Sequence, residues 1–214
     1  MSQARIERVV TRGTFTLDGE TFDVDNNVWL VGDDEEVLVV DAAHDARTIH
    51  AAVAGRRVTA IVCTHAHDDH IDAAPALSAL TGAPVLLHPD DHELWSLTHP
   101  ARKPDGELTD GRVLTVAGIS LHVLHTPGHT WGSCCLHAPS LTAVFTGDTL
   151  FHGGPGATGR SYSDRPAIEA SIRARLLTLP GDTVVHTGHG QDTTIAAERS
   201  TVPASPSPLS DPAS

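Results

Sequence analysis

The sequence predicts an α/β protein of four layers, αββα, in which two mixed β-sheets pack face to face and helices cover their outer faces. Strands early in the chain are joined by tight turns, as in hairpins, whereas later strands alternate with helices. Hydrophobic residues make up 40% of the chain and charged residues 19%, which is typical of a globular domain. These observations together favour one layered domain.

The first half of the chain begins with a hairpin. β-Branched and aromatic residues flank an acidic turn at Gly32–Glu36, and Gly82 and Pro84 end a helical stretch. In chain order the expected elements are a hairpin over residues 27–42, a helix over 45–54, a buried strand over 58–64, a helix over 72–80 and a short strand over 84–88.

The second half is expected to contain more strands and one longer helix. Ala117-Gly118 reads as a turn between two strands, and Asp164 and Pro166 suit the start of a helix. The expected elements are strands over 112–116, 119–124, 133–137 and 143–146, a helix over 166–179, a strand over 183–187 and a short helix over 193–199.

The length of 214 residues suits a single domain, which we expect over residues 1–200. Residues 201–214 are rich in proline and serine, a composition that cannot bury a core, so they are expected to be a disordered tail. No apolar run is long enough for a signal peptide or a membrane-spanning helix. We therefore expect no membrane association.

The charge and the cysteines constrain partners and compartment. The chain has 14 basic and 27 acidic residues, a formal net charge of −13, which argues against a nucleic-acid partner and favours a small substrate. Three cysteines, two of them adjacent, form no disulfide framework, which fits a reducing cytoplasm. One lysine against 13 arginines, with abundant alanine, suggests a bacterial genome of high GC content.

One segment concentrates potential metal ligands. The sequence IVCTHAHDDH ends a predicted buried strand and supplies His65, His67, Asp69 and His70 within six residues. Imidazole and carboxylate groups bind divalent metals, and alternation along an extended segment lets His65 and His67 face one side. An isolated histidine is usually a surface or core residue, but this density indicates a metal site.

Three further candidates share one context. His129, Asp148 and His189 each follow a predicted strand and lie beside glycine. Because strand ends can meet at one sheet edge and glycine permits sharp turns, these side chains can converge on the first segment.

The pattern of His65, His67, Asp69 and His70 matches the H-x-H-x-D-H motif, and the chain resembles the metallo-β-lactamase superfamily over residues 27–198. The resemblance implies a first metal bound by His65, His67 and His129 and a second bound by Asp69, His70 and His189. It implies that Asp148 bridges the two ions. Asp41 corresponds to a supporting residue just outside the ligand set.

Within the superfamily the chain looks closest to bacterial glyoxalase II-like enzymes, through GDTLF at residues 147–151 and GGPGATGRSYSD at 153–164. This implies a thioester hydrolase with two divalent ions, zinc being expected and iron or manganese being alternatives. The ions would supply hydroxide at neutral pH. Asp148, and Asp69 if it assists proton movement, are the catalytic candidates; the carrier thiol, glutathione, mycothiol or another, stays open.

Substrate-binding candidates lie after Asp148. Arg160 is the strongest, since a guanidinium can pair with a carboxylate of a thiol carrier; a role in fixing its own loop is an equal alternative. The full set of candidates is Phe151, His152, Arg160, Ser161 and Tyr162.

Other activities of the same fold remain possible from the sequence. A persulfide dioxygenase would use a single iron, for which His65, His129 and Asp148 would suffice. A lactone or β-lactam hydrolase is a third interpretation, although the commonest β-lactamases need a cysteine in place of Asp148. A metal-storage or scaffold protein would bind metal without turnover.

Overall fold

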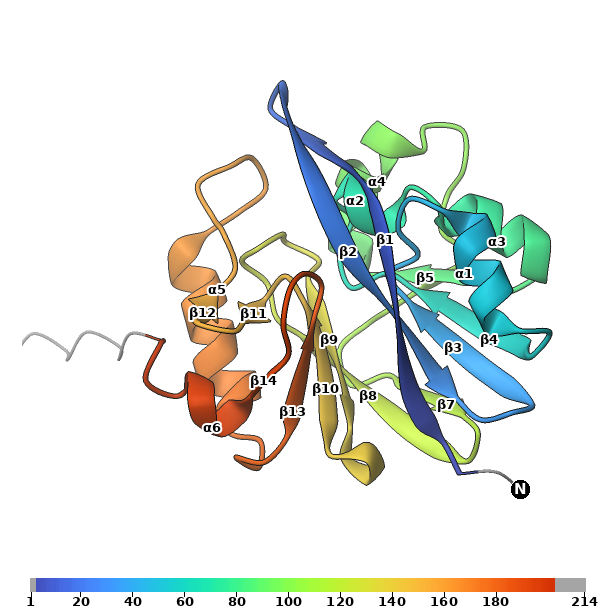
Figure 1. Ribbon diagram of the computed structural model, residues 1–214. Helices are drawn as coiled ribbons and strands as arrows, with labels where there is room; N and C mark the ends of the chain where they lie inside the picture. The colour runs from blue at the N-terminus through green and yellow to red at the C-terminus, as the bar shows by residue number, and fades with distance from the viewer. Residues whose placement is uncertain (1–2, 203–214) are drawn as a thin grey trace, which may run out of the picture.

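The computed structural model describes residues 3–202, which form two six-stranded sheets packed face to face (Figure 1). The first sheet has the strand order β1-β2-β3-β4-β5-β6, antiparallel at the β1, β2 and β3 end and parallel beyond it. Its strands are β1 (Arg5–Leu17), β2 (Glu20–Gly32), β3 (Glu36–Val40), β4 (Arg57–Val62), β5 (Val85–Leu87) and β6 (Gly106–Glu107).

The second sheet has the order β14-β13-β10-β9-β8-β7, with one parallel pair, β10 and β13. Its strands are β7 (Val113–Val116), β8 (Ile119–His125), β9 (Cys134–Ala138), β10 (Ala143–Gly147), β13 (Val184–Thr187) and β14 (Thr193–Thr194). A separate two-stranded ribbon joins β11 (Leu150–Phe151) to β12 (Gly154–Pro155). Both large sheets are therefore mixed, as the sequence predicts.

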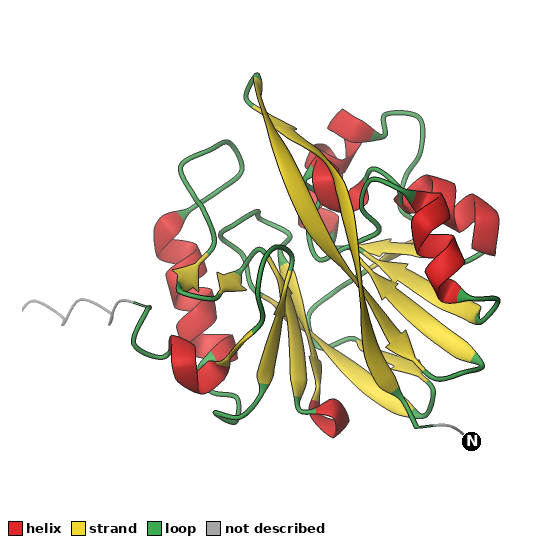
Figure 2. Ribbon diagram, in the orientation of Figure 1, coloured by secondary structure: helices red, strands yellow, loops and turns green. Residues whose placement is uncertain are grey.

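Helices cover the outer face of each sheet (Figure 2). On the first sheet lie α1 (Ala46–Val53), α2 (Asp68–Ile71), α3 (Ala74–Thr81) and α4 (His92–Thr98). On the second lie α5 (Arg165–Ser171), continued by a π-helical turn over Ile172–Leu176, and α6 (Ile195–Glu198). Short 3-10 turns occur at Pro89–Asp91 and Pro139–Leu141.

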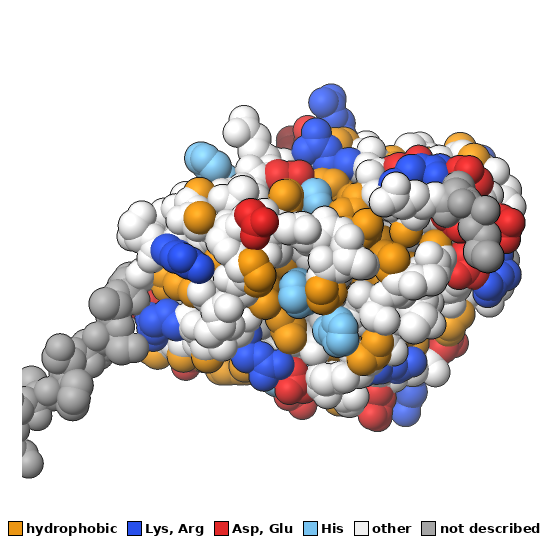
Figure 3. Space-filling model, turned by 90° about the horizontal axis from the view of Figure 1, so that it is seen from below, with side chains coloured by type: hydrophobic (Ala, Val, Ile, Leu, Met, Phe, Trp, Pro, Cys, Tyr) orange, Lys and Arg blue, Asp and Glu red, His pale blue; other side chains and the backbone are white. Residues whose placement is uncertain are grey.

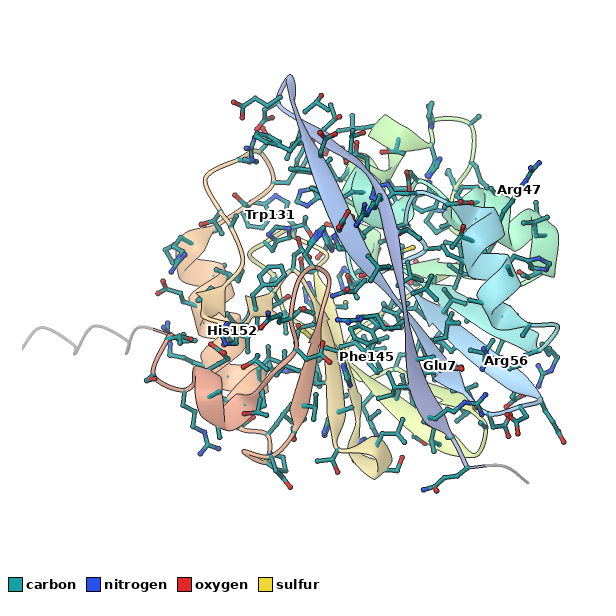
Figure 4. All side chains as sticks on the ribbon, viewed as in Figure 1. Glu7, Arg47, Arg56, Trp131, Phe145 and His152 are labelled. Atoms are coloured by element: carbon teal, nitrogen blue, oxygen red, sulfur yellow. The ribbon has the colours of Figure 1, made fainter. Side chains whose placement is uncertain are left out.

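Three apolar clusters fill the three spaces between the four layers. Alternate residues of β2 face opposite ways: Trp29 packs against the second sheet, whereas Leu30 packs against the helices of the first, as the two-residue period of a strand requires. Phe145 lies between the sheets (Figure 4), and Ile168 packs α5 onto the second sheet. The αββα sandwich is confirmed.

The main departure from the sequence prediction is a long hairpin at the start of the chain. Every residue of β1 pairs with β2, from Arg5 opposite Gly32 to Leu17 opposite Glu20, whereas the sequence indicated strands only from residue 27. Most side chains of β1 are exposed or half-buried, so its apolar pattern is weak. The tip turns at Asp18-Gly19, where both residues have positive φ, and projects beyond the sheets (Figure 1).

Smaller differences concern the helices. The helix α4 was not predicted from the sequence. The first two residues of the predicted last helix, Thr193 and Thr194, instead form the strand β14. Val202, assigned from sequence to the tail, is buried against the α5 and α6 layer, and the Thr201 hydroxyl donates to the Glu198 carbonyl at 2.9 Å. The folded part thus reaches at least residue 202; the rest of the predicted tail lies outside the described residues.

The surface carries both charged and apolar side chains. On the face seen in Figure 3, acidic and basic side chains are interspersed with apolar ones. Over residues 3–202, no helix has the length and apolar character needed to cross a membrane.

Candidate metal centre

The predicted ligands follow strands, in loops or, for Asp69 and His70, in the short helix α2. The segment from His65 to His70 follows β4, His129 follows β8, Asp148 follows β10 and His189 follows β13. β4 is parallel to its neighbours in the first sheet, and β10 is parallel to β13 in the second. Carboxyl ends of parallel strands meet at one edge, so both sheets deliver polar side chains to the same place.

The first predicted ligand set is assembled by three imidazoles. His67 Nδ1 lies 3.0 Å from His65 Nε2 and 3.0 Å from His129 Nε2, and all three rings are buried. Nitrogens about 2.05 Å from a tetrahedral zinc ion lie about 3.3 Å from one another. The spacing of these atoms therefore suits a small divalent cation.

The second predicted set joins one carboxylate to two imidazoles. Asp69 Oδ2 lies 3.2 Å from His189 Nε2 and 3.5 Å from His70 Nε2, and the two Nε2 atoms are 3.1 Å apart. These separations again match the edges of a coordination tetrahedron. Asp69 and His70 are buried, whereas the His189 side chain keeps 24% exposure.

Asp148 lies between the two sets. Its Oδ2 is 3.6 Å from His129 Nε2 of the first set and 3.5 Å from His189 Nε2 of the second, and its Oδ1 is 3.3 Å from His70 Nε2. Within the described residues this buried Oδ1 atom has no hydrogen-bond partner. A buried carboxylate oxygen left in this state fits a cation ligand.

Glycine makes the approach of Asp148 possible. A Cβ on Gly188 would lie 2.3 Å from Asp148 Oδ1 and 2.7 Å from His70 Cε1. Gly147, next to Asp148, has φ +48° and its Cβ would lie 2.2 Å from Thr64 Oγ1. A side chain at Gly188 would push Asp148 and His70 away, and one at Gly147 would displace Thr64, which lies behind the ligands.

Outer hydrogen bonds orient the rings. His129 Nδ1 lies 2.9 Å from the Ala157 carbonyl and His189 Nδ1 lies 2.8 Å from the Asp25 carbonyl. A carbonyl oxygen only accepts, so each Nδ1 donates and, in a neutral ring, Nε2 presents a lone pair to the site.

From just outside the two sets, Asp41 contacts His70 directly and reaches His65 through Thr64. Its Oδ2 lies 3.0 Å from His70 Nδ1 and accepts from the Thr64 hydroxyl at 2.8 Å. The same hydroxyl lies 3.1 Å from His65 Nδ1, so one carboxylate orients a ring in each set. Asp41 has φ +55°, a strained conformation that surrounding contacts must maintain.

Asp91 is a supporting residue that sequence reasoning missed. Its buried carboxylate accepts hydrogen bonds from Ala66 N at 2.9 Å, Gly132 N at 2.6 Å and Thr130 Oγ1 at 2.7 Å. It thereby joins the loop of His65 and His67 to the loop of His129. Burial raises the pKa of Asp91 in spite of these hydrogen bonds.

The surroundings shift the pKa values of histidines in the two sets in opposite directions. Burial lowers the pKa of His65 well below its usual value and, together with His129, lowers the pKa of His67 to about 3. Burial also opposes charge on His189, but Asp148 and Asp69 outweigh it and raise the pKa of His189 to about 10. The pKa of His70 is likewise raised, by Asp69 and Asp148 against burial.

The pKa values of the two carboxyl groups, Asp69 and Asp148, are lowered. Burial alone would raise the pKa of Asp69, but His70 and His189 lower it to about 2. The pKa of Asp148 lies well below its usual range, because His189 and His70 outweigh burial. In the absence of cations, protons on His70 and His189 balance the negative charges of Asp69 and Asp148. Bound cations would take the place of these protons.

A cavity of about 270 Å³ opens above the ligands. Phe15, Phe22 and Val24 of the β1–β2 hairpin give the cavity an apolar wall, and Ala157 and Arg160 also line it. Sequence analysis did not identify these three residues as part of the site, because it predicted strands only from residue 27 onward and they precede it.

The predicted substrate residues are divided. Arg160 and Ser161 line the cavity, whereas Phe151 and His152 line a separate shallow hollow beside His189; His152 is labelled in Figure 4. Tyr162 lines neither described pocket, and its hydroxyl lies 3.1 Å from Glu93 Oε1.

Arg160 lines the cavity and is also held by the β1–β2 hairpin. Its Nη1 pairs with Glu20 Oε2 at 2.7 Å, and its guanidinium carbon lies 4.9 Å from the Phe22 ring centre and 5.9 Å from that of Phe15. The alternative in which Arg160 fixes its own loop accounts for these contacts.

Two relatives among curated proteins illustrate the range of similarity. An uncharacterised protein of Aquifex aeolicus is 34% identical over 81% of this chain and 88% of its own length. A hydroxyacylglutathione hydrolase of Pseudomonas aeruginosa is 37% identical over 77% of this chain, but the match spans only 62% of that enzyme.

Solved structures agree on the fold. BLEG-1, described as a B3 metallo-β-lactamase, superposes with a TM-score of 0.77 at 29% identity, covering 90% of this chain and 98% of that one. TTHA1623, solved in a di-iron-bound form, gives 0.74 at 34% identity, with coverages of 84% and 95%. ETHE1 of Myxococcus xanthus gives 0.71 at 27% identity, with coverages of 91% and 83%.

The sequence profile of the metallo-β-lactamase superfamily matches residues 21–189, a span that contains every predicted ligand. With the shared fold and the His and Asp clusters at the strand ends, this chain belongs to the metallo-β-lactamase superfamily, a family of metal-dependent hydrolases.

Proposed function

We propose that this protein is a dinuclear metal-dependent hydrolase that cleaves small thioesters, similar to glyoxalase II. The observation that carries the proposal is the position of Asp148, whose Oδ2 lies within 3.6 Å of a ligand nitrogen from each set. The likeness to a hydroxyacylglutathione hydrolase supports the substrate class. We assign the metal roles as the sequence suggests, with zinc as the expected ion.

When bound, two divalent cations would lower the pKa of a shared water toward about 7 and polarise the substrate carbonyl. His65, His67 and His129 would hold one cation, and Asp69, His70 and His189 the other, with Asp148 between them. Apolar walls from Phe15, Phe22 and Val24 would exclude bulk water from the acyl group.

The cavity favours a leaving group that needs no proton. Its titratable lining residues are five predicted ligands and Arg160, and Arg160 is engaged by Glu20. No further acid therefore faces the substrate among the described residues. A thiol has a pKa near 8.5 and leaves as a thiolate, whereas an amide nitrogen must be protonated as it leaves. The site thus suits a thioester better than an amide or a β-lactam.

The test compares three substrates that share one small acyl group: a thioester, an oxygen ester and an amide. We expect metal-dependent thiol release from the thioester and at least about 100-fold lower kcat/KM for the amide. A chromogenic β-lactam serves as the second comparison. Equal turnover of the amide or the β-lactam would contradict the assignment, and oxygen uptake on a persulfide with a single bound iron would establish the dioxygenase instead.

A further inference from the structure

We propose that Asn26 and His44 are positioning residues for the second metal site, acting through Asp69. The proposal rests on the dinuclear centre described above. Asn26 Nδ2 donates to Asp69 Oδ2 at 2.9 Å, in a fully buried contact. This is the same oxygen that faces His70 and His189.

The hydrogen bond fixes which oxygen of Asp69 points into the site. A carboxylate oxygen has lone pairs for two partners, so Oδ2 can accept from Asn26 and still bind a cation. Without Asn26, no hydrogen bond from β2 would restrict rotation of the Asp69 carboxylate about its Cβ–Cγ bond. The ligand would then lose its preset orientation.

His44 fixes the amide of Asn26. A side-chain amide can face either way, and its flipped form would turn an oxygen toward Asp69 and repel it. His44 Nε2 lies 2.8 Å from Asn26 Oδ1. Because that oxygen carries no hydrogen, Nε2 must donate, which holds the amide nitrogen toward Asp69.

The His44 ring is itself clamped in place. Asp72 accepts from the His44 backbone N–H at 2.6 Å and lies 3.2 Å from its Nδ1. A Cβ on Gly13 of β1 would lie 2.2 Å from the ring, so only glycine leaves room there. His44 has φ +61°, a conformation that such contacts must maintain.

The hydrogen-bonded chain begins and ends on one segment. It runs from Asp69 through Asn26 and His44 to Asp72, three residues after Asp69. The neighbours of Asn26 serve the same site: the Asp25 carbonyl orients His189, and Asn27 N donates to the Gly188 carbonyl at 2.8 Å. This stretch of β2 therefore supports the second set, and within residues 3–202 the hydrogen bonds of Asn26 and Asn27 do not reach His65, His67 or His129.

The experiment removes metal from the whole protein with a chelator and titrates it with Co²⁺, following ion uptake and the visible spectrum. Asn26→Leu keeps the size of the side chain and removes the hydrogen bond. We expect the second ion to bind about 10- to 100-fold more weakly, while the affinity of the first ion and its spectrum stay unchanged. His44→Phe should give the same selective loss, and His44→Gln, which restores an N–H donor, should recover part of it.

Equal weakening of both ions in the Asn26 and His44 variants would show a merely structural role and overturn the inference, as would wild-type affinity for the second ion. Thermal unfolding of the metal-free proteins shows whether Asn26→Leu folds. If it does not fold, comparison of His44→Phe with His44→Gln tests the inference instead. A wild-type protein that binds only one ion would contradict the proposed dinuclear function itself. That result is distinct from equal weakening of both ions in the variants, which would contradict only the role of Asn26 and His44.

Discussion

The two predicted ligand sets lie side by side but hold their protons differently. In the first set, burial leaves His65 and His67 neutral, with the pKa of His67 lowered to about 3. In the second, Asp69 and Asp148 raise the pKa of His189 to about 10. His65 and His67 thus have lone pairs free for a cation, whereas a cation in the second set is expected to displace protons. Two adjacent sites of similar geometry therefore differ in what cation binding requires.

The largest effect is expected from the residue that the sets share. Asp148→Ala removes a ligand atom from both, so we expect weaker binding of both ions and a loss of at least about 10³-fold in kcat/KM, or about 4 kcal/mol. Elemental analysis and thiol release check this together. Asp148→Asn, which keeps the shape, is the matched variant. Two ions retained in Asp148→Ala would refute the bridging assignment.

The pH dependence separates the two sets. Asp148 and Asp69 raise the pKa of His189 to about 10, so between pH 6 and pH 8 we expect a cation to displace a proton from this ring and its affinity to rise with pH. One displaced proton gives on the order of a 100-fold gain between pH 6 and pH 8. The first ion displaces no proton from His65 or His67 in this range, so its affinity should depend less on pH. Isothermal titration at both pH values measures the difference; identical slopes for the two ions would contradict it.

Asp91 should act on the first set as Asn26 acts on the second. Asp91→Asn replaces an acceptor that holds the loops of His67 and His129, so the first ion should bind about 10-fold more weakly. The second ion should be less affected. Metal titration of Asp91→Asn beside Asn26→Leu gives opposite selectivities if the sets are supported separately, and the same selectivity if they are not.

Outside the ligand sets the effects should be smaller. Arg160→Ala breaks the half-exposed pair with Glu20 and the contact with Phe22, and we expect KM to rise roughly fivefold, about 1 kcal/mol, with metal content unchanged. Arg160→Lys keeps the charge as a comparison. Steady-state kinetics and metal analysis check this; a loss of bound metal would mean that Arg160 supports the metal centre instead of the substrate.

The smallest change is predicted for Tyr162→Phe. The hydroxyl lies beside Glu93 and does not line the cavity, so kcat, KM and ion content should match the wild type. A KM raised several-fold would return Tyr162 to the substrate site.

The layered fold and the ligand constellation were accessible from sequence for physical reasons. Buried strands show as short apolar runs, as at Ala60–Val62 of β4 and Ala143–Phe145 of β10, and potential ligands follow these strands within a few residues. His65, His67 and Asp148 are conspicuous because histidine and aspartate rarely cluster after apolar strands.

The rest depended on contacts between distant segments. Asn26 serves Asp69 from 43 residues away and Asp91 serves Ala66 from 25, and neither asparagine nor aspartate is unusual in isolation. The apolar wall of Phe15 and Phe22 lies on a hairpin whose first strand is largely exposed, so its periodicity gives little signal. Arg160 was ambiguous because its partner, Glu20, is 140 residues away.

The most direct test of the shared centre is the number of metal ions per chain in the same sample that is assayed for thiol release from a small S-acyl thiol. Two ions per chain, with thiol release lost on chelation and restored by adding the metal back, is the predicted result. One ion per chain at full activity, or thiol release that survives complete removal of metal, would contradict it.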